Sequence, residues 1–264
     1  MIERIPENLH FYRYEFKYVL NGDRLSSLAK VLDNHLCRDE HCGENGDYPI
    51  RSIYFDSPDM RWFHEKKNGL EKRFKYRLRT YSHGDSGYAH PLYLELKGRD
   101  GSLVIKHRVR LPVEEFSGGI GGGAGWLREL LYKTSPGNNV AERFIAQSFR
   151  YRLAPSVITD YKRAAWEDHN NPDFRATIDT ASTAWRTSWN GLPEGIPEEI
   201  IPGGGIVEIK FRYRIPFWFQ RFVKEMNLSR ISISKFQRAV EAVYLNHDGT
   251  RLNRLIERRI ACLH

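Results

Sequence analysis

The chain has 264 residues, enough for one large domain or two small ones. Hydrophobic residues make up 41% of it and aromatic residues 13%, which allows a packed core and excludes global disorder. The formal net charge of +8 favours an anionic partner, namely nucleic acid, a phosphorylated small molecule or an acidic membrane surface.

The sequence contains no pattern that predicts export or insertion into a membrane. No apolar run approaches the length of a membrane span, and residues 1–16 lack the apolar centre of a signal peptide. The three cysteines, Cys37, Cys42 and Cys262, are too few and odd in number for a disulfide framework. We therefore expect the protein in a reducing cytoplasm.

Strand-like and helix-like stretches alternate along the chain. Strands are expected at 12–20, 50–57, 74–81, 91–98, 103–111, 156–166, 174–180 and 206–212, and helices at 21–37, 126–133, 141–153, 216–226 and 233–245. The stretch 181–205, rich in Pro and Gly, predicts a long connection. Because no repeat or compositional break divides the chain, we expect a single α+β domain over residues 1–264, built around a mostly antiparallel sheet.

Most of the expected strands carry charge on one face. In the stretch RFKYRLRTY, cations occupy every second position at Arg73, Lys75, Arg77 and Arg79. Such neighbours lie roughly 6.8 Å apart and repel each other by roughly 2.4 kcal/mol at an effective dielectric of about 20. Similar faces recur in other strands: Arg13, Glu15 and Lys17; Glu95 and Lys97; Lys106, Arg108 and Arg110; Arg175, Thr177 and Asp179; Glu208, Lys210 and Arg212.

Two arrangements explain a charged strand face. In an open sheet, the charged face lies in water and the apolar face covers the core. Like charges on adjacent strands weaken that arrangement, and here cations recur in strand after strand. The alternative is a closed antiparallel β-barrel of about eight strands, with a cationic tunnel inside and amphipathic helices packed on the outside. We favour the barrel, whose passage would be roughly 26 Å long.

A phosphate chain is the ligand that suits this set of side chains. Arginine offers phosphate a planar fork and lysine a compact charge. A divalent metal often bridges further phosphate oxygens and needs carboxylates. Glu15, Glu95 and Glu208 lie on the same strand faces as the cations, so we expect them to be the metal ligands.

Nine short motifs, in order, resemble the VTC domain, the polyphosphate polymerase domain among the CYTH-like triphosphate tunnel metalloenzymes. They are RYEFKY (13–18), SIYFDS (52–57), KYRLRTY (75–81), YLELK (93–97), KHRVR (106–110), YKRAAW (161–166), RATID (175–179), VEIKF (207–211) and SKFQRAVEAVY (234–244). Each motif alone is weak, whereas the ordered set is specific. The resemblance implies a tunnel of eight antiparallel strands that binds ATP with Mn²⁺ or Mg²⁺. It also implies transfer of the γ-phosphoryl group to a growing inorganic polyphosphate chain, with release of ADP.

The resemblance also implies roles for single residues. The expected phosphate-binding and catalytic cations are Lys17, Arg77, Arg79, Lys97, Lys106, Arg163, Arg175 and Lys235, with Glu208 as the metal ligand. We add Lys75, Arg108, Arg110 and Lys210 as substrate-binding residues because they share strand faces with these cations.

One position departs from the superfamily's hydrolytic members, which open with Glu-x-Glu-x-Lys. Here Arg13 replaces the first acid, before Glu15 and Lys17, as in the polymerase branch. Two other activities remain open: a triphosphatase that hydrolyses tripolyphosphate or nucleoside triphosphate, and a non-catalytic polyphosphate-binding module. A nucleic-acid partner is not expected, because charge inside a tunnel cannot contact a duplex.

The chain resembles the stand-alone prokaryotic form, because the regulatory and membrane-spanning segments of eukaryotic relatives are missing from it. The sequence neither predicts nor excludes a membrane-associated partner, and it predicts no oligomeric state.

Overall fold

The computed structural model describes residues 14–81, 91–100, 103–112, 114 and 123–245. Its strands are β1 (Tyr14–Asn21), β2 (Cys37–Arg38), β3 (Tyr48–Asp56), β4 (Lys72–Thr80), β5 (Leu92–Asp100), β6 (Leu103–Leu111), β7 (Ala154–Glu167), β8 (Arg175–Arg186), β9 (Glu194–Glu199) and β10 (Gly204–Phe211). Its helices are α1 (Gly22–His35), α2 (Arg61–Lys67), α3 (Gly123–Thr134), α4 (Asn139–Tyr151), α5 (Phe217–Glu225) and α6 (Lys235–Val240), which a π-helical turn (Glu241–Leu245) extends.

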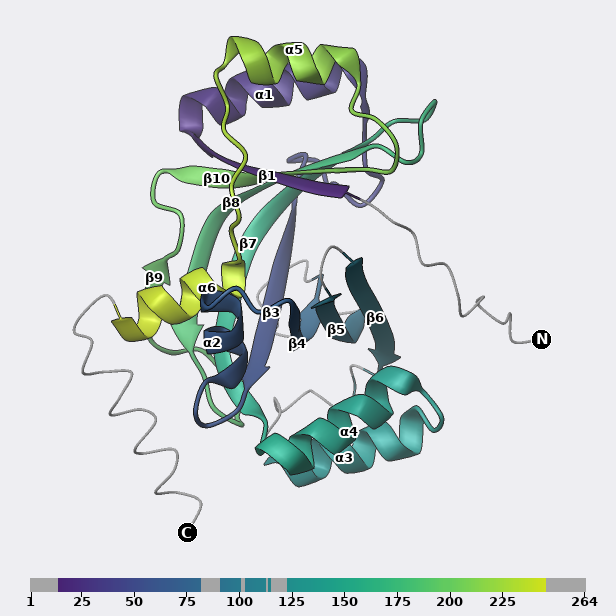
Figure 1. Cartoon of the computed structure of the whole chain (residues 1–264), viewed down its shortest axis with the longest axis vertical. Coiled ribbons are helices and arrows are strands. Elements are labelled where there is room, and N and C mark those ends of the chain that lie inside the picture. Colours follow the sequence, from purple (N-terminus) through teal and green to yellow (C-terminus); the bar gives the residue numbers. More distant parts are fainter. Residues whose placement is uncertain (1–13, 82–90, 101–102, 113, 115–122, 246–264) are drawn as a thin grey trace.

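All ten strands belong to one antiparallel sheet, so the predicted α+β class with a large antiparallel sheet is confirmed. The order along the sheet is β1-β10-β8-β7-β3-β4-β5-β6, with β2 added beside β7 and β9 beside β8. The long strands β3, β7 and β8 curve through the middle of the molecule and connect its two ends (Figure 1).

The expected closed barrel is wrong. Among the described residues, β1 pairs only with β10 and β6 only with β5, so no backbone ladder joins the two ends of the sheet. Side chains approach across this gap instead, since Lys97 Nζ of β5 lies 3.4 Å from Glu15 Oε2 of β1. Alternation along a strand shows which residues share a face, but it does not show whether the edge strands pair.

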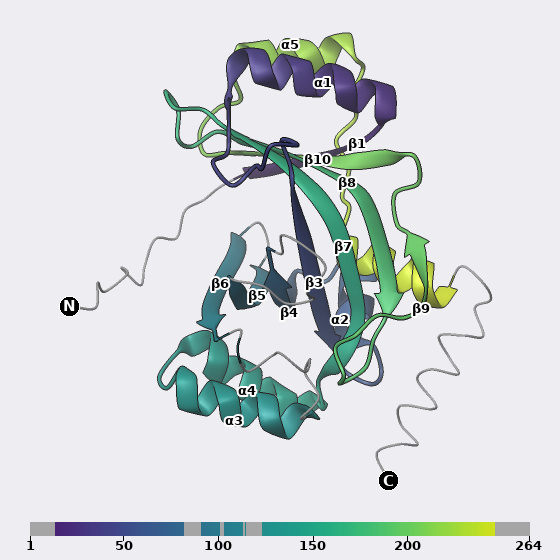
Figure 2. The same cartoon turned by 180° about the vertical axis from the view of Figure 1, so that it is seen from behind.

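Most of the helices lie in two groups at the ends of the sheet, and α2 and α6 lie between these groups (Figure 1). Helices α1 and α5 lie side by side over β1 and β10 at one end, and α3 and α4 lie at the other end near β6 (Figures 1 and 2). Under α1 and α5, Leu28, Leu32 and Phe219 form a core with Trp166 of β7 and with Phe174, which precedes β8. A second, larger core lies beneath α2, α3, α4 and α6. This arrangement leaves the concave face of the sheet for charged groups.

Three elements were absent from the sequence prediction, namely β2, β9 and α2. Strand β9 lies in the stretch expected to be a long connection. Helix α2 begins where the buried Asp56 accepts hydrogen bonds from the backbone N–H groups of Trp62 (3.0 Å) and Phe63 (3.1 Å). That carboxylate satisfies donors which a helix start otherwise leaves unpaired.

A search of the described residues finds no helix that is both long and apolar enough to cross a membrane.

Candidate functional site

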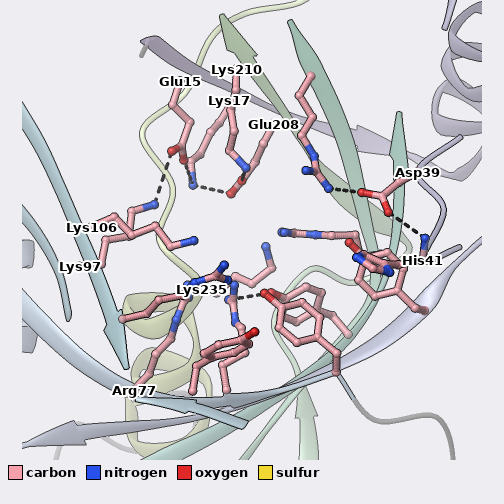
Figure 3. A pocket seen from close by; sticks show the side chains of 18 of the residues that line it. Glu15, Lys17, Asp39, His41, Arg77, Lys97, Lys106, Glu208, Lys210 and Lys235 are labelled. Carbon is pink, nitrogen blue, oxygen red and sulfur yellow. Dashed lines mark hydrogen bonds and ion pairs between the residues drawn. The ribbon is translucent and has the colours of Figure 1, made fainter. Parts of the chain in front are cut away.

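A cavity of about 940 Å³ lies on the concave face of the sheet. Figure 3 shows side chains entering it from several sides, with Lys97 and Lys106 opposite Asp39 and His41, and Glu15, Lys17, Glu208 and Lys210 along another wall. Twelve Lys and Arg residues line it, against five Asp and Glu residues. The cavity therefore contains most of the protein's excess positive charge.

Thirteen of the fifteen predicted site residues line this cavity. They are Glu15, Lys17, Lys75, Arg77, Arg79, Lys97, Lys106, Arg108, Arg163, Arg175, Glu208, Lys210 and Lys235. Arg110 is exposed and is not a lining residue. Glu95 is 0% exposed and lies beneath the arginines rather than at the cavity surface.

The floor of the cavity is formed by Arg77 and Arg79 of β4, with Glu95 behind them. Arg77 donates from Nε to Glu95 Oε2 at 2.7 Å, and its Nη2 lies 2.6 Å from the same oxygen. Arg79 Nη1 lies 3.8 Å from Glu95 Oε2, and its Nη2 donates to the Tyr161 hydroxyl at 2.9 Å. Although burial alone would raise the pKa of Glu95, the two guanidinium groups lower it well below its usual range. Glu95 is thus an ionised counter-charge that fixes the two arginines.

The wall formed by β1 and β10 carries the carboxylates that do face the cavity. Lys17 Nζ bridges Glu208 Oε1 (2.7 Å) and Glu15 Oε1 (2.9 Å). The other Glu208 oxygen lies 3.3 Å from Lys210 Nζ. Burial and the nearby Glu208 would raise the pKa of Glu15, but Lys97 and Lys17 lower it to about 2. Although burial would raise the pKa of Glu208, Lys17 and Lys210 hold it well below its usual value, so both carboxylates are ionised at neutral pH.

Three lysines reach the cavity from β4, β5 and β6. Burial and the cations Lys97 and Arg77 lower the pKa of Lys75 well below its usual value, and its ammonium group donates to Ser234 Oγ at 3.1 Å. Burial also lowers the pKa of Lys97, although Glu15 opposes that change. Half of the Lys106 side chain stays accessible, yet the surrounding walls exclude enough water to lower its pKa to about 7. These lysines gain stabilisation when an anion arrives.

Asp179 joins two predicted site residues that come from distant parts of the chain. Arg163 of β7 donates from Nε and Nη2 to its carboxylate at 2.6 and 2.7 Å, and Lys235 of α6 binds the same group. The Asp179 side chain is fully buried, and the two cations hold its pKa below its usual value against the effect of burial. Helix α6 is in this way attached to the cavity wall.

Arg175 lies toward the opposite end of the cavity from Lys106. It pairs with Asp39, and its Nη1 lies 2.7 Å from Glu167 Oε1. Three further lining residues were not predicted from the sequence, namely Asp39, His41 and Glu167. Asp39 and His41 follow β2 and Glu167 ends β7, so none of them belongs to a charged strand face.

The aromatic lining of the cavity was also missed. The rings of Tyr48 and Tyr81 lie 6.1 Å apart, and those of Tyr81 and Tyr93 lie 6.4 Å apart. Arg108 stacks over Tyr93 at 4.5 Å. The sequence signal was present, since Tyr81 and Tyr93 continue the charged faces of β4 and β5 by two residues each.

The carboxylates that face the cavity suit a metal ion for which phosphate oxygens supply further ligands. The described residues contain no group of three or more His, Cys, Asp and Glu side chains that could hold an ion by themselves. Glu15 and Glu208 are close enough to share Lys17, and both face the cavity. Because Mg²⁺ usually binds one or two carboxylates, several waters and substrate phosphates, these two residues fit such an ion.

Comparisons with known proteins show the family of this chain and, in one solved structure, a similar fold. A sequence model of the VTC domain matches residues 12–244. A Bacillus halodurans protein described as a "putative adenylate cyclase" shares the fold with a TM-score of 0.51 and 17% identity, over 85% of this chain and 95% of that one. The PH1819 protein of Pyrococcus horikoshii aligns with a TM-score of 0.42 and 11% identity, over 94% and 99% of the two chains. A search of curated proteins found no match. On the strength of the match over residues 12–244, this chain belongs to the VTC domain family.

Proposed function

We propose that this protein is a metal-dependent polyphosphate polymerase that transfers the γ-phosphoryl group of ATP to an inorganic polyphosphate chain and releases ADP. The observation that carries this proposal is the cavity itself. Twelve cations and two paired, cavity-facing carboxylates lie on the concave sheet face of a VTC domain. Few ligands other than a chain of phosphates bring enough negative charge to offset such a lining.

The chain's own groups would bind and orient the phosphates. Arg77 and Arg79 are fixed by Glu95, Ser52 and two tyrosine hydroxyls, so little freedom is lost when they meet a phosphate. Lys97, Lys106, Lys210 and Lys235 surround the same space and would stabilise charge on the transferred group. Glu15 and Glu208 would hold Mn²⁺ or Mg²⁺, which when bound neutralises charge on the phosphate oxygens.

The transfer needs no base from the protein. The terminal oxygen of the acceptor chain is already anionic and forms the new P–O bond. The bond between the γ-phosphorus and the β–γ bridging oxygen breaks, and ADP leaves with the electron pair. Phosphoryl transfer depends mainly on positioning and electrostatic stabilisation, and this cavity is built for both.

The aromatic end of the cavity favours a nucleotide as the donor. Tyr81 and Tyr93 lie two residues beyond the cationic part of β4 and β5, and both line the cavity. A nucleobase can stack on such rings while its phosphates extend along the cations.

The test is to incubate the purified protein with ATP and Mn²⁺ or Mg²⁺, resolve the products on a gel stained for polyphosphate, and measure ADP. We expect a polymer ladder and stoichiometric ADP. Release of inorganic phosphate without polymer would instead identify a triphosphatase. Tight, salt-dependent binding of polyphosphate without ADP would identify a binding module.

Arg77→Ala and Arg79→Ala extend this test to the cavity floor. Each should weaken nucleotide binding and slow the reaction, because each removes a fixed phosphate-binding group. Circular dichroism and thermal unfolding would show whether the fold is retained. Activity equal to that of the unaltered protein in both variants would refute the assignment of this cavity as the site.

A further inference from the structure

The cationic row of β4 continues past the cavity. Arg79, Arg77 and Lys75 line the cavity, and Arg73 is the next residue on the same strand face but is not part of the lining. On β5, Lys97 lines the cavity and Arg99 follows it in the same way. Each step of two residues advances roughly 6.8 Å along the strand.

Arg73 and Arg99 lie directly opposite each other in the antiparallel register of β4 and β5. Like charges in that position weaken strand pairing, so the fold keeps them together at a cost. Lys66 of α2 belongs to the same cluster. Burial together with Arg73 and Arg99 lowers the pKa of Lys66, and burial together with Arg99 lowers that of Arg73. We call Lys66, Arg73 and Arg99 the outer basic patch.

The known contacts of this patch are with neutral groups. Lys66 Nζ donates to Ser232 Oγ at 3.3 Å, and Arg73 donates to the Leu70 carbonyl. Some exposed helical cations of this protein pair with a glutamate one turn away, as in Arg61–Glu65 and Arg221–Glu225. Unlike those two arginines, the cations of the outer basic patch form no ion pair with an acid in the part of the chain described.

Lys66 also connects the patch to the cavity. It acts electrostatically on Lys75, which lines the cavity, and Lys17 of the cavity wall acts on Lys66. An anionic chain that leaves the cavity along the β4 and β5 faces would meet the patch next.

We propose that the outer basic patch binds the part of a polyphosphate chain that extends beyond the cavity. The proposal rests on the proposed function, because it assumes that the cavity holds the reacting end of the same chain. Two arginines paired across β4 and β5, together with Lys66 of α2, suit one extended chain. They are too few for a nucleic-acid duplex, which typically needs about 6–10 phosphate contacts for tight binding.

The test compares a short and a long ligand on the full chain. Affinities for tripolyphosphate and for long-chain polyphosphate would be measured by calorimetry at two salt concentrations. The variant is Arg73→Gln with Arg99→Gln. The control is Arg24→Gln with Lys30→Gln, which removes the same charge from the exposed face of α1.

We expect the Arg73/Arg99 variant to bind the long chain about tenfold more weakly, with a shallower salt dependence, because two charge-assisted contacts are lost. Its affinity for tripolyphosphate should change less than twofold, and the control should match the unaltered protein for both ligands. If the double variant does not fold, Lys66→Gln tests the same prediction with a smaller expected loss.

Unchanged affinity for the long chain would overturn the proposal, as would an equal loss for both ligands. An equal loss for single-stranded RNA of similar charge would also overturn it, since the patch would then be a general polyanion surface. A selective loss for long polyphosphate would support the patch even if no polymer forms from ATP, so its outcome is separate from that of the polymerase assay.

Discussion

Two groups of ion pairs border the cavity, and they differ in how exposed their carboxylates are. On the floor, Glu95 is 0% exposed and Arg77 covers it. On the wall, Glu15 and Glu208 share Lys17 and line the cavity. Burial behind an arginine favours a permanent ion pair, because separating it would leave a charge in a dry environment.

The comparison assigns different tasks to similar residues. Glu95 holds Arg77 and Arg79 in position, so its loss should affect the fold first. Glu208 is held by lysines that can turn toward an arriving phosphate, so its loss should affect the reaction first. The sequence expectation that all three glutamates bind metal did not separate these tasks.

The largest effect is expected for Glu208→Gln. The variant keeps the shape of the side chain but removes the charge that would hold a divalent cation, so ATP turnover should fall by about a thousandfold. Glu167→Gln is the matched control, because it removes a carboxylate from the opposite end of the cavity. Steady-state assays over a range of Mn²⁺ concentration, with thermal unfolding alongside, measure both. Equal losses in the two variants would show that Glu208 has no special role.

Glu95→Gln should act mainly on stability. Removing one partner of a buried ion pair leaves two guanidinium groups uncompensated, so the free energy of unfolding should fall by about 3–5 kcal/mol. Asp160→Asn is the control, since its pair with Arg51 is partly exposed and should contribute about 1 kcal/mol or less. Urea unfolding followed by circular dichroism compares them. A similar small loss in both would mean that Glu95 is not the structural centre of the floor.

Lys106 should make phosphate binding depend on pH. Its ammonium group faces Glu95 of β5, Arg77 and Arg79 of β4, and Lys210 of β10. Burial and the three cations lower its pKa from 10.5 to about 7, although Glu95 opposes them. The unliganded protein thus loses this charge as pH rises through about 7, whereas a bound phosphate favours the charged form.

Affinity for tripolyphosphate should therefore fall above pH 7, by up to about tenfold per pH unit, with proton uptake on binding. Between about pH 7 and pH 10.5, Lys106 is protonated in the unfolded state and largely unprotonated in the free folded state. Because the unfolded state then binds more protons, the contribution of Lys106 to the free energy of unfolding rises with pH across this window. Calorimetry in buffers of different ionisation enthalpy measures the uptake. Lys106→Arg, which stays charged, should remove the effect, and a pH dependence that persists in this variant would assign it to another group.

The smallest effect is expected for Tyr93→Ala. Loss of a stacking surface should weaken ATP binding by about fivefold, at the lower end of what base–aromatic contacts contribute. Tripolyphosphate, which has no base, should bind as before. Competition between the two ligands measures the difference directly, and an equal loss for both would mean that Tyr93 acts through Arg108, which stacks on it.

The sequence was informative where a local pattern decides the structure. The alternation in β4 correctly placed Arg77 and Arg79 on one face, and the same rule grouped Glu208 with Lys210. The predicted strand near 174–180 continues to Arg186, past Ala181, whose positive φ of 47° bends the strand without ending it.

Contacts between segments that are distant in the sequence could not be predicted from local patterns. Asp179 was noted on its strand face, but its pairing with Arg163 and Lys235 depends on how β7, β8 and α6 meet. Closure of the sheet depends likewise on the angle at which β1 and β6 approach, which no single strand encodes.

The crowding of cations on the concave face has a consequence for how the whole molecule behaves. The cavity lining carries seven more basic than acidic residues, against eight for the entire chain. The isoelectric point of about 9.3 thus reflects the lining of the cavity more than the rest of the chain. On a chromatographic cation exchanger the protein should be retained more weakly than its sequence implies, and filling the cavity with phosphate should shift its electrophoretic mobility without any change in composition.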